Sequence, residues 1–320
     1  MNGHPDRPGQ TGTGQGTAQP EMGRPAASRP VVLDFDASVL PLSPDELRIP
    51  LGDWQEDIRF GCTLRRYAAL EKHLEALMPP EYGCVFTGSG DYHHLSLYLL
   101  RHLARRSALA PASLDLVVCD NHPDNMRYPF GLHCGSWVRH AAGLACIRQI
   151  HVIGIASTDI TLAHAWENYL APLVRKKLVY WSVGRRADWL GLLGRGGQAH
   201  SFASAGELAA AVAPVLRTSD HLYLSIDKDV LSPAAARTTW DQGVFGLDHL
   251  EAVIRNCSGR LVGADITGDV SAYAYAGRGK RFLVRLDGQH NTDAARLASW
   301  RQAQQAVNAH LLTLLRPAMA

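Results

Sequence analysis

Three potential metal ligands follow directly on an apolar stretch in this sequence of 320 residues. The letters LVVC at 116–119 are continued by DNHPD at 120–124. Asp120, His122 and Asp124 alternate, so in an extended backbone their side chains project to the same side. Two carboxylates and one imidazole suit a divalent transition metal such as Mn, Zn, Co or Ni.

Two further clusters repeat this pattern. Asp227 and Asp229 follow the apolar segment 222–226, and the glycine-rich turn 88–90 leads to His93 and His94. Because a single ion commonly takes about three or four protein ligands, six or seven groups indicate two ions bridged by shared carboxylates. Two such ions, roughly 3.5–4 Å apart, hold a water between them as hydroxide near neutral pH.

Each cluster also has a structural interpretation. An isolated Asp-x-Asp after a strand is more often a helix cap or a turn former, and a histidine pair at a helix start is usually structural. The occurrence of three such clusters, each at the end of a separate apolar strand, is what favours metal binding over these readings.

The elements that must position these groups are strands alternating with helices. Four apolar residues in a row before Asp120 predict a central parallel strand covered on both faces, with its polar cluster at the carboxyl end, where open α/β sheets bind ligands. Strands are predicted at 31–36, 84–87, 114–119, 150–155, 178–183, 222–226, 261–266 and 282–286. Helices are predicted at 64–77, 95–103, 137–144, 162–174, 205–216, 247–254 and 292–315. This alternation predicts a three-layer α/β/α sandwich with a mostly parallel sheet.

Composition places the chain among ordinary globular proteins, with 46% hydrophobic and 19% charged residues. We expect a tail at 1–29 that is too rich in Gly, Pro, Gln and Thr to fold, followed by one α/β domain at 30–320. A net charge of +2 with scattered basic residues gives no argument for nucleic acid. The absence of a long apolar run or a signal-peptide pattern, and six cysteines without paired spacing, predict a cytoplasmic protein with reduced thiols and no membrane association.

These motifs resemble those of the ureohydrolases, the family of arginase, agmatinase and formiminoglutamase. The segment 120–124 resembles their Asp-Ala-His-x-Asp, and SIDKDVLSP at 225–233 resembles their Ser-x-Asp-x-Asp-x-x-Asp-Pro. GSGDYHH at 88–94 takes the place of their Gly-Gly-Asp-His-Ser, and FGLHCGS at 130–136 resembles the segment with their active-site histidine. The resemblance extends over roughly residues 83 to 270 and is most specific in the first two motifs.

The resemblance implies a centre of two ions, usually Mn²⁺, bridged by Asp120 and Asp227. Asp124 with either His93 or His94 would complete one ion. His122 with Asp229 would complete the other. The bridging hydroxide would attack the carbon of a small guanidino or amidino substrate. His133 would serve as a proton shuttle or a substrate contact, and an assembly of several copies is common in the family.

The sequence departs from the family pattern at Tyr92, Gly131, Ser232 and Gly268, and the departure at Gly268 bears most directly on the substrate. Gly268 stands where the family has a glutamate that pairs with the substrate guanidinium, which leaves Asp269, one residue later, as the candidate replacement. The loop with Trp240 and Asp241 follows the second aspartate motif and is a candidate to shape the pocket, although Asp241 equally fits a turn.

Two other functions stay open at this point. One is a zinc deacetylase of related fold, which would bind one ion through Asp120, His122 and Asp227. The other is a non-catalytic relative that binds a metal or a metabolite without turnover, which the altered glutamate position favours.

Overall fold

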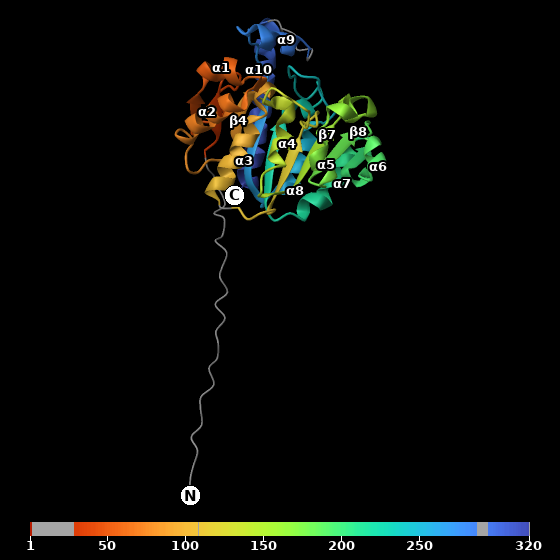
Figure 1. The fold of residues 1–320 in the computed structure, drawn as a ribbon. Helices are drawn as coiled ribbons and strands as arrows, with labels where there is room; N and C mark the ends of the chain where they lie inside the picture. The colour runs from red at the N-terminus through yellow and green to blue at the C-terminus, as the bar shows by residue number, and fades with distance from the viewer. Residues whose placement is uncertain (2–28, 108, 287–293, 320) are drawn as a thin grey trace.

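The computed structural model describes residues 1, 29–107, 109–286 and 294–319, so nearly all of the predicted N-terminal tail lies outside the described residues. A sheet of nine strands runs through the molecule (Figure 1). The strands lie in the order β2-β1-β4-β11-β10-β5-β7-β8-β9, and all the strand pairs are parallel. The strands are β1 (Val31–Asp34), β2 (Leu47–Pro50), β4 (Val85–Ser89), β5 (Leu114–Cys119), β7 (Ile147–Ile155), β8 (Leu178–Val183), β9 (Ala199–Phe202), β10 (Leu222–Asp227) and β11 (Leu261–Asp269). A small antiparallel pair joins β3 (Gly61–Cys62) to β6 (Leu132–His133).

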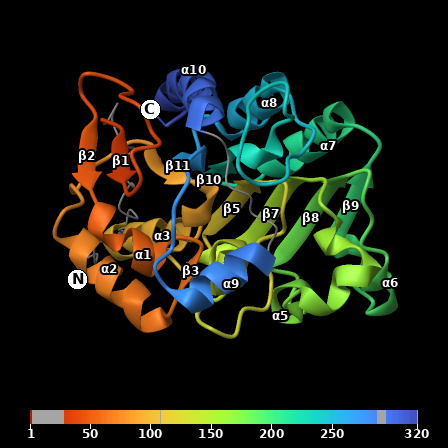
Figure 2. The same ribbon diagram turned by 90° about the horizontal axis from the view of Figure 1, so that it is seen from above.

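Helices cover both faces of this sheet, which confirms the predicted three-layer α/β/α architecture. Figure 2 shows α7, α8 and α10 on one side of the strands, and α1 to α3 with α5 and α6 on the other. The helices are α1 (Gln55–Ile58), α2 (Leu64–Glu75), α3 (Leu95–Arg106), α4 (Trp137–Ala141), α5 (Leu170–Val174), α6 (Trp189–Leu192), α7 (Ala205–Arg217), α8 (Leu247–Cys257), α9 (Arg278–Leu286) and α10 (Ala294–Ala318). Side-chain caps mark two helix starts: Thr63 accepts a hydrogen bond from the amide of Arg66 before α2, and Ser204 accepts one from Glu207 before α7.

One predicted strand is wrong. Residues 282–286 belong to helix α9, and the sequence misled because a short apolar run fits a strand and a helix turn equally well. Phe282 is 62% exposed, whereas Leu283 and Val284 pack against a small cluster around Phe60. The segment is tied to α1 by Lys280, whose Nζ donates to the carbonyl of Glu56. The predicted helix at 162–174 is also interrupted, into the short turn η5 (Leu162–Glu167) and α5.

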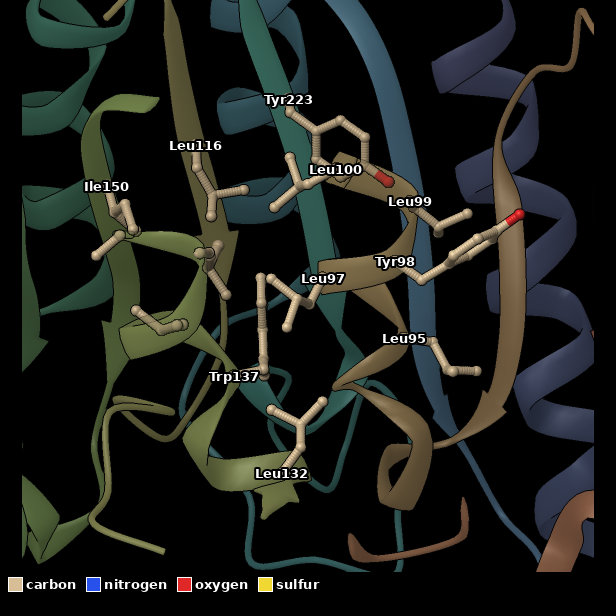
Figure 3. Close-up of a cluster of buried hydrophobic side chains, with 14 of the residues drawn as sticks. Leu95, Leu97, Tyr98, Leu99, Leu100, Leu116, Leu132, Trp137, Ile150 and Tyr223 are labelled. Carbon is tan, nitrogen blue, oxygen red and sulfur yellow. The ribbon is translucent and has the colours of Figure 1, made fainter. Parts of the chain in front are cut away.

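The core lies in two layers, one on each face of the sheet. Figure 3 shows part of one layer, in which Leu97 and Leu100 of α3 face Leu116 of β5 and Tyr223 of β10. Helix α3 is buried all round in its first two turns, which is typical of a helix enclosed by the protein rather than lying on its surface. It therefore fixes the loop that precedes it, between β4 and α3, against the sheet.

Strand order places the predicted ligands together. Strands β4, β11, β10 and β5 are consecutive neighbours in the sheet, and all run in the same direction. Their carboxyl ends therefore meet at one edge, where the loops after β4, β5 and β10 converge. This edge carries the candidate site.

All six cysteines lie within the described residues, where each is buried and outside any disulfide. No helix in the described ranges is both long enough and apolar enough to cross a lipid bilayer.

Candidate metal centre

The first group of candidate ligands joins the loops after β4 and β5. Nδ1 of His93 lies 2.8 Å from Oδ2 of Asp124 and 3.1 Å from Oδ2 of Asp120. Oδ2 of Asp227 lies 3.6 Å from the same nitrogen. All four side chains are buried. This set of one imidazole and three carboxylates suits a divalent transition metal.

Asp124 adopts a strained backbone conformation in order to reach this position. Its φ of +46° lies in the left-handed region, which residues other than glycine rarely adopt. Its Oδ2 accepts a hydrogen bond of 2.6 Å from Nε1 of Trp137, which fixes the carboxylate beside His93. Strain of this kind persists where the surrounding contacts hold it, and it concentrates at functional sites.

The second group shares Asp120 with the first. Nδ1 of His122 lies 2.9 Å from Oδ2 of Asp229 and 3.5 Å from Oδ1 of Asp120. The two carboxylate oxygens of Asp120 thus face different histidines, His93 and His122. Two ligand groups that share one carboxylate are what a pair of bridged ions requires.

Burial and mutual repulsion hold protons on part of this cluster. Burial raises the pKa of Asp124 and of Asp229 to about 7, and the charge of Asp120 acts in the same direction on both. Burial and the charge of Asp229 also raise the pKa of Asp227 well above its usual range. Divalent cations relieve such repulsion by replacing protons, so this set of donors fits a metal pair.

Each of the two candidate histidines, His93 and His122, turns its Nδ1 toward the shared carboxylate Asp120 and its Nε2 toward an outer partner. Nε2 of His93 lies 2.9 Å from Oγ of Ser225, which in turn donates to Oδ1 of Asp265 at 2.8 Å. Tyr223 also donates to Asp265, through a bond of 2.7 Å. Outer hydrogen bonds of this kind fix the ring orientation and the tautomer of a metal-binding histidine.

The structure separates the two adjacent histidines at the start of α3. His93 joins the first group of candidate ligands, whereas His94 is fully buried and packs near Tyr67. Burial lowers the pKa of His94 well below its ordinary value, so it is a neutral core residue. Of the two candidates, the structure brings only His93 to the other ligands.

His133 lines the pocket over the ligand groups. Its Nδ1 accepts a hydrogen bond of 2.9 Å from the amide of Gly135, which places the ring proton of the neutral form on Nε2. Burial lowers the pKa of His133 to about 4, so the ring is neutral at pH 7.

Asp269 does not line this pocket. Its Oδ1 pairs with Nζ of Lys228 at 2.8 Å and accepts a hydrogen bond of 2.9 Å from Asn308 of α10, and all three side chains are buried. The carboxylate therefore serves the packing of β11 against α10. The structure gives no support to the expectation that it replaces the family's glutamate.

A pocket of about 320 Å³ opens above the ligands, and no Lys or Arg is among the described residues that line it. Three carboxylates beyond the ligand groups contribute to its wall, those of Asp159, Glu167 and Asp241. Asp159 follows the carboxyl end of β7, so the rule that located the other strand-end ligands could have found it. Glu167 lies in the turn η5, and we find no sequence signal for it.

Comparison with known proteins bears on the fold. No protein-family model matches the sequence. An uncharacterized protein from Thermotoga maritima is 29% identical over 208 residues, which cover 64% of this chain and 66% of that protein, just under two thirds of its length.

Similar solved structures cover nearly the whole chain. Proclavaminate amidino hydrolase from Streptomyces clavuligerus has a TM-score of 0.53 and 17% identity, over 93% of this chain and 94% of that one. Formimidoylglutamase from Bacillus subtilis has a TM-score of 0.53 and 12% identity, over 95% of both chains. Agmatine ureohydrolase of Thermoplasma volcanium has a TM-score of 0.52 and 17% identity, over 92% of this chain and 90% of that one. The chain therefore has the arginase-like α/β fold of the ureohydrolases.

Proposed function

We propose that this chain is a hydrolase that uses two divalent metal ions, with Mn²⁺ as the expected metal, to cleave a carbon–nitrogen bond of a small guanidino or amidino compound. The observation that carries the proposal is the pair of three-ligand groups that share Asp120 at the floor of the pocket. The similar folds include enzymes named for amidino and agmatine substrates, which supports this reaction class.

Two bound ions would supply hydroxide near neutral pH at the floor of the pocket. Asp120 would contribute a ligand to both ions, because one of its carboxylate oxygens faces His93 and the other faces His122. His93 would complete one ion with Asp124, and His122 would complete the other with Asp229. Asp227 would be the second shared ligand. Its Oδ2 lies 3.6 Å from Nδ1 of His93, and its side chain accepts a hydrogen bond from the amide of Asp229.

The charge of the pocket supports a cationic substrate. The described lining holds Asp159, Glu167 and Asp241 beyond the proposed ligands, and it holds no basic side chain. The four positive charges of two divalent ions would balance the four proposed ligand carboxylates. The other three carboxylates would then leave the pocket wall with a net negative charge. An amidinium or guanidinium group would be attracted to such a wall, whereas an anionic substrate would be repelled.

His133 is suited to hold the substrate rather than to carry protons at pH 7. The amide of Gly135 occupies its Nδ1, so the neutral ring can offer Nε2–H to an acceptor in the pocket. We therefore assign His133 a hydrogen bond to the substrate or to the leaving group.

The experiment starts from metal content. The protein is stripped of metal, reloaded with Mn²⁺ and analysed by plasma mass spectrometry. It is then assayed for urea release from agmatine and arginine, and for formamide release from formiminoglutamate. Two ions per chain together with turnover of one of these compounds support the proposal. A single tightly bound Zn²⁺ would favour the deacetylase instead.

One observation favours the non-catalytic alternative. Gly268 and Asp269 provide no carboxylate in the pocket where the resemblance places a substrate-binding glutamate. Two bound ions without release of urea, formamide, ammonia or acetate from any compound tested would support this alternative.

A further inference from the structure

Both ring nitrogens of His122 contact carboxylates. One of these carboxylates, that of Asp241, belongs to a loop outside the proposed metal-binding motifs. Nδ1 faces Asp229 and Asp120, while Nε2 lies 2.7 Å from Oδ1 of Asp241. Both ring nitrogens face carboxylate oxygens, which only accept, so without metal both nitrogens donate. A metal ion would replace the hydrogen on Nδ1, and Nε2 would keep the hydrogen that it donates to Asp241.

Asp241 is itself held by Asn121. Nδ2 of Asn121 donates to Oδ2 and to the backbone carbonyl of Asp241, at 3.1 Å each. Oδ1 of Asn121 accepts from the amide of Ala156 at 3.2 Å, and its backbone amide donates to Oδ1 of Asp229 at 3.0 Å. One asparagine thus connects the ends of β5 and β7, the loop after β10, and a ligand carboxylate.

The loop around Asp241 is also fixed on its far side. Gln242 donates to the carbonyls of Leu231 and Ala236, at 3.0 and 2.8 Å. The amide of Gly243 donates to the carbonyl of Asp229 at 2.6 Å, and a β-carbon at position 243 would lie 2.4 Å from the carbonyl oxygen of Val230. The position of Asp241 is therefore set by backbone contacts as well as by side chains.

The two histidines obtain their outer support in different ways. His93 relies on Ser225 and Asp265, which are fully buried in the sheet. His122 relies on Asp241, whose side chain is 67% exposed. Because solvent screens a charge in such a place, Asp241 contributes orientation of the ring more than electrostatic attraction.

We propose that Asp241, anchored by Asn121, is the positioning residue that holds the His122 ring for the metal ion shared with Asp229. The inference rests on the proposed metal centre. It adds the residue that raises the affinity of one of the two metal positions for its ion. Outer hydrogen bonds to metal ligands are typically worth about 10- to 100-fold in metal affinity.

The test is Mn²⁺ titration of the metal-free full-length chain by calorimetry, with free Mn²⁺ followed by electron paramagnetic resonance. In Asp241→Ala we expect one of the two ions to bind about 10- to 100-fold more weakly, with the other unchanged. Asp241→Asn keeps an oxygen that can accept from Nε2–H, so it should recover part of the lost affinity. Asn121→Ala should weaken binding of the same ion to a smaller degree. Alanine is a suitable substitution because the ureohydrolase motif Asp-Ala-His-x-Asp has alanine at the corresponding position.

Asp159→Asn is the matched control. It removes a carboxylate from the same pocket wall, but Asp159 makes no described hydrogen bond to His122. The inference is overturned if Asp241→Ala binds both ions with wild-type affinity, or if it weakens both to the degree seen in Asp159→Asn. A wild-type chain that binds no Mn²⁺ overturns the metal centre itself, and this result is distinct from a failure of Asp241 alone.

A second readout follows the ring directly. In the Zn²⁺-loaded protein, the proton on Nε2 of His122 should give a slowly exchanging signal in nitrogen–proton spectra, assigned by its loss in His122→Gln. Asp241→Ala should lose that protection while its thermal unfolding in the metal-free state stays close to wild type. Protection that persists in Asp241→Ala contradicts the positioning role.

Discussion

Gly268 lies so close to Asp227 that a β-carbon at position 268 would be 2.5 Å from Oδ1 of that carboxylate. The backbone there has φ of +91°, a conformation that glycine adopts without cost. The resemblance places a substrate-binding glutamate at this position, and this backbone leaves no room for one. The missing glutamate is thus coupled to the placement of a proposed metal ligand.

We expect Gly268→Ala to lower the free energy of unfolding by more than the cost of placing alanine at a positive φ. We also expect it to reduce binding of Mn²⁺. The strained φ costs about 1 kcal/mol or more for alanine, and the contact with Asp227 adds to it. Gly184→Ala is the control, because Gly184 has φ of +66° and nothing within 4 Å of an added β-carbon. Denaturant unfolding and Mn²⁺ titration measure both variants. Equal losses in the two would show that the contact with Asp227 is unimportant.

The sharing of Asp120 predicts an asymmetry among ligand variants. Asp120→Ala should abolish binding of both ions, because its two oxygens face both ligand groups. Asp124→Ala and Asp229→Ala should each lose one ion, because each contacts one histidine. Plasma mass spectrometry after Mn²⁺ loading counts the ions. Full metal content in Asp120→Ala would eliminate the dinuclear arrangement.

Asp269→Ala should act on stability rather than on substrate binding. It leaves the ammonium of Lys228 buried without its carboxylate, and breaking a buried pair in this way costs about 3–5 kcal/mol. Lys228→Met combined with Asp269→Leu removes both charges and should recover most of that loss. Chemical denaturation measures both proteins. An Asp269→Ala protein of normal stability and raised KM would instead restore the substrate role expected from the sequence.

Stabilisation by metal should increase with pH. The pKa values of Asp124 and Asp229 lie near 7, so both must lose protons on metal binding, and those protons compete below about pH 7. In the metal-free chain, these raised values mean that the two groups contribute stability at low pH that is lost as the pH rises through 7. The rise in Tm on Mn²⁺ addition should therefore be larger near pH 8 than near pH 6.

Two buried histidines outside the candidate site, His102 and His151, do not affect the rise in Tm on Mn²⁺ addition. Burial lowers the pKa of His102 and His151 to about 4, so their effect on stability lies at lower pH and is common to the metal-free and metal-loaded proteins. The comparison is therefore the difference in Tm between the two states at each pH. A difference that is constant from about pH 6 to about pH 8 would contradict proton competition at the ligand carboxylates.

If the proposed hydrolysis is found, His133→Phe should lower kcat/KM by about 100-fold or more, the range typical of removing one hydrogen-bond donor to the reacting group. Phenylalanine keeps the packing against Phe60 but removes the ring nitrogens. Because the pKa of His133 is about 4, its titration should not shape the pH dependence of kcat/KM between about pH 6 and about pH 7. Any inflection of the wild-type profile in that range should therefore persist in the variant. An inflection lost on substitution would assign His133 to proton transfer.

The sequence by itself determined the layers of the fold and most of the proposed ligands. Asp120, His122, Asp124, Asp227 and Asp229 follow apolar strands, and parallel strands bring such residues to one edge whatever the details of packing. Alternation of strand and helix required only short-range patterns, so the three-layer architecture could be predicted. The apolar run at 282–286 could not be assigned in this way, because its length fits both kinds of element.

Tertiary structure decided everything that depends on direction and on distant partners. His93 and His94 are adjacent on a helical backbone and point about 100° apart, so only the packing of α3 determines which one reaches the ligands. Asp269 is the last residue of β11 and so lies at a strand end like the other candidates, yet its carboxylate pairs with Lys228 and Asn308 in the core. Asp241 is 119 residues from His122 in the chain, and only the folded loop brings the two into contact.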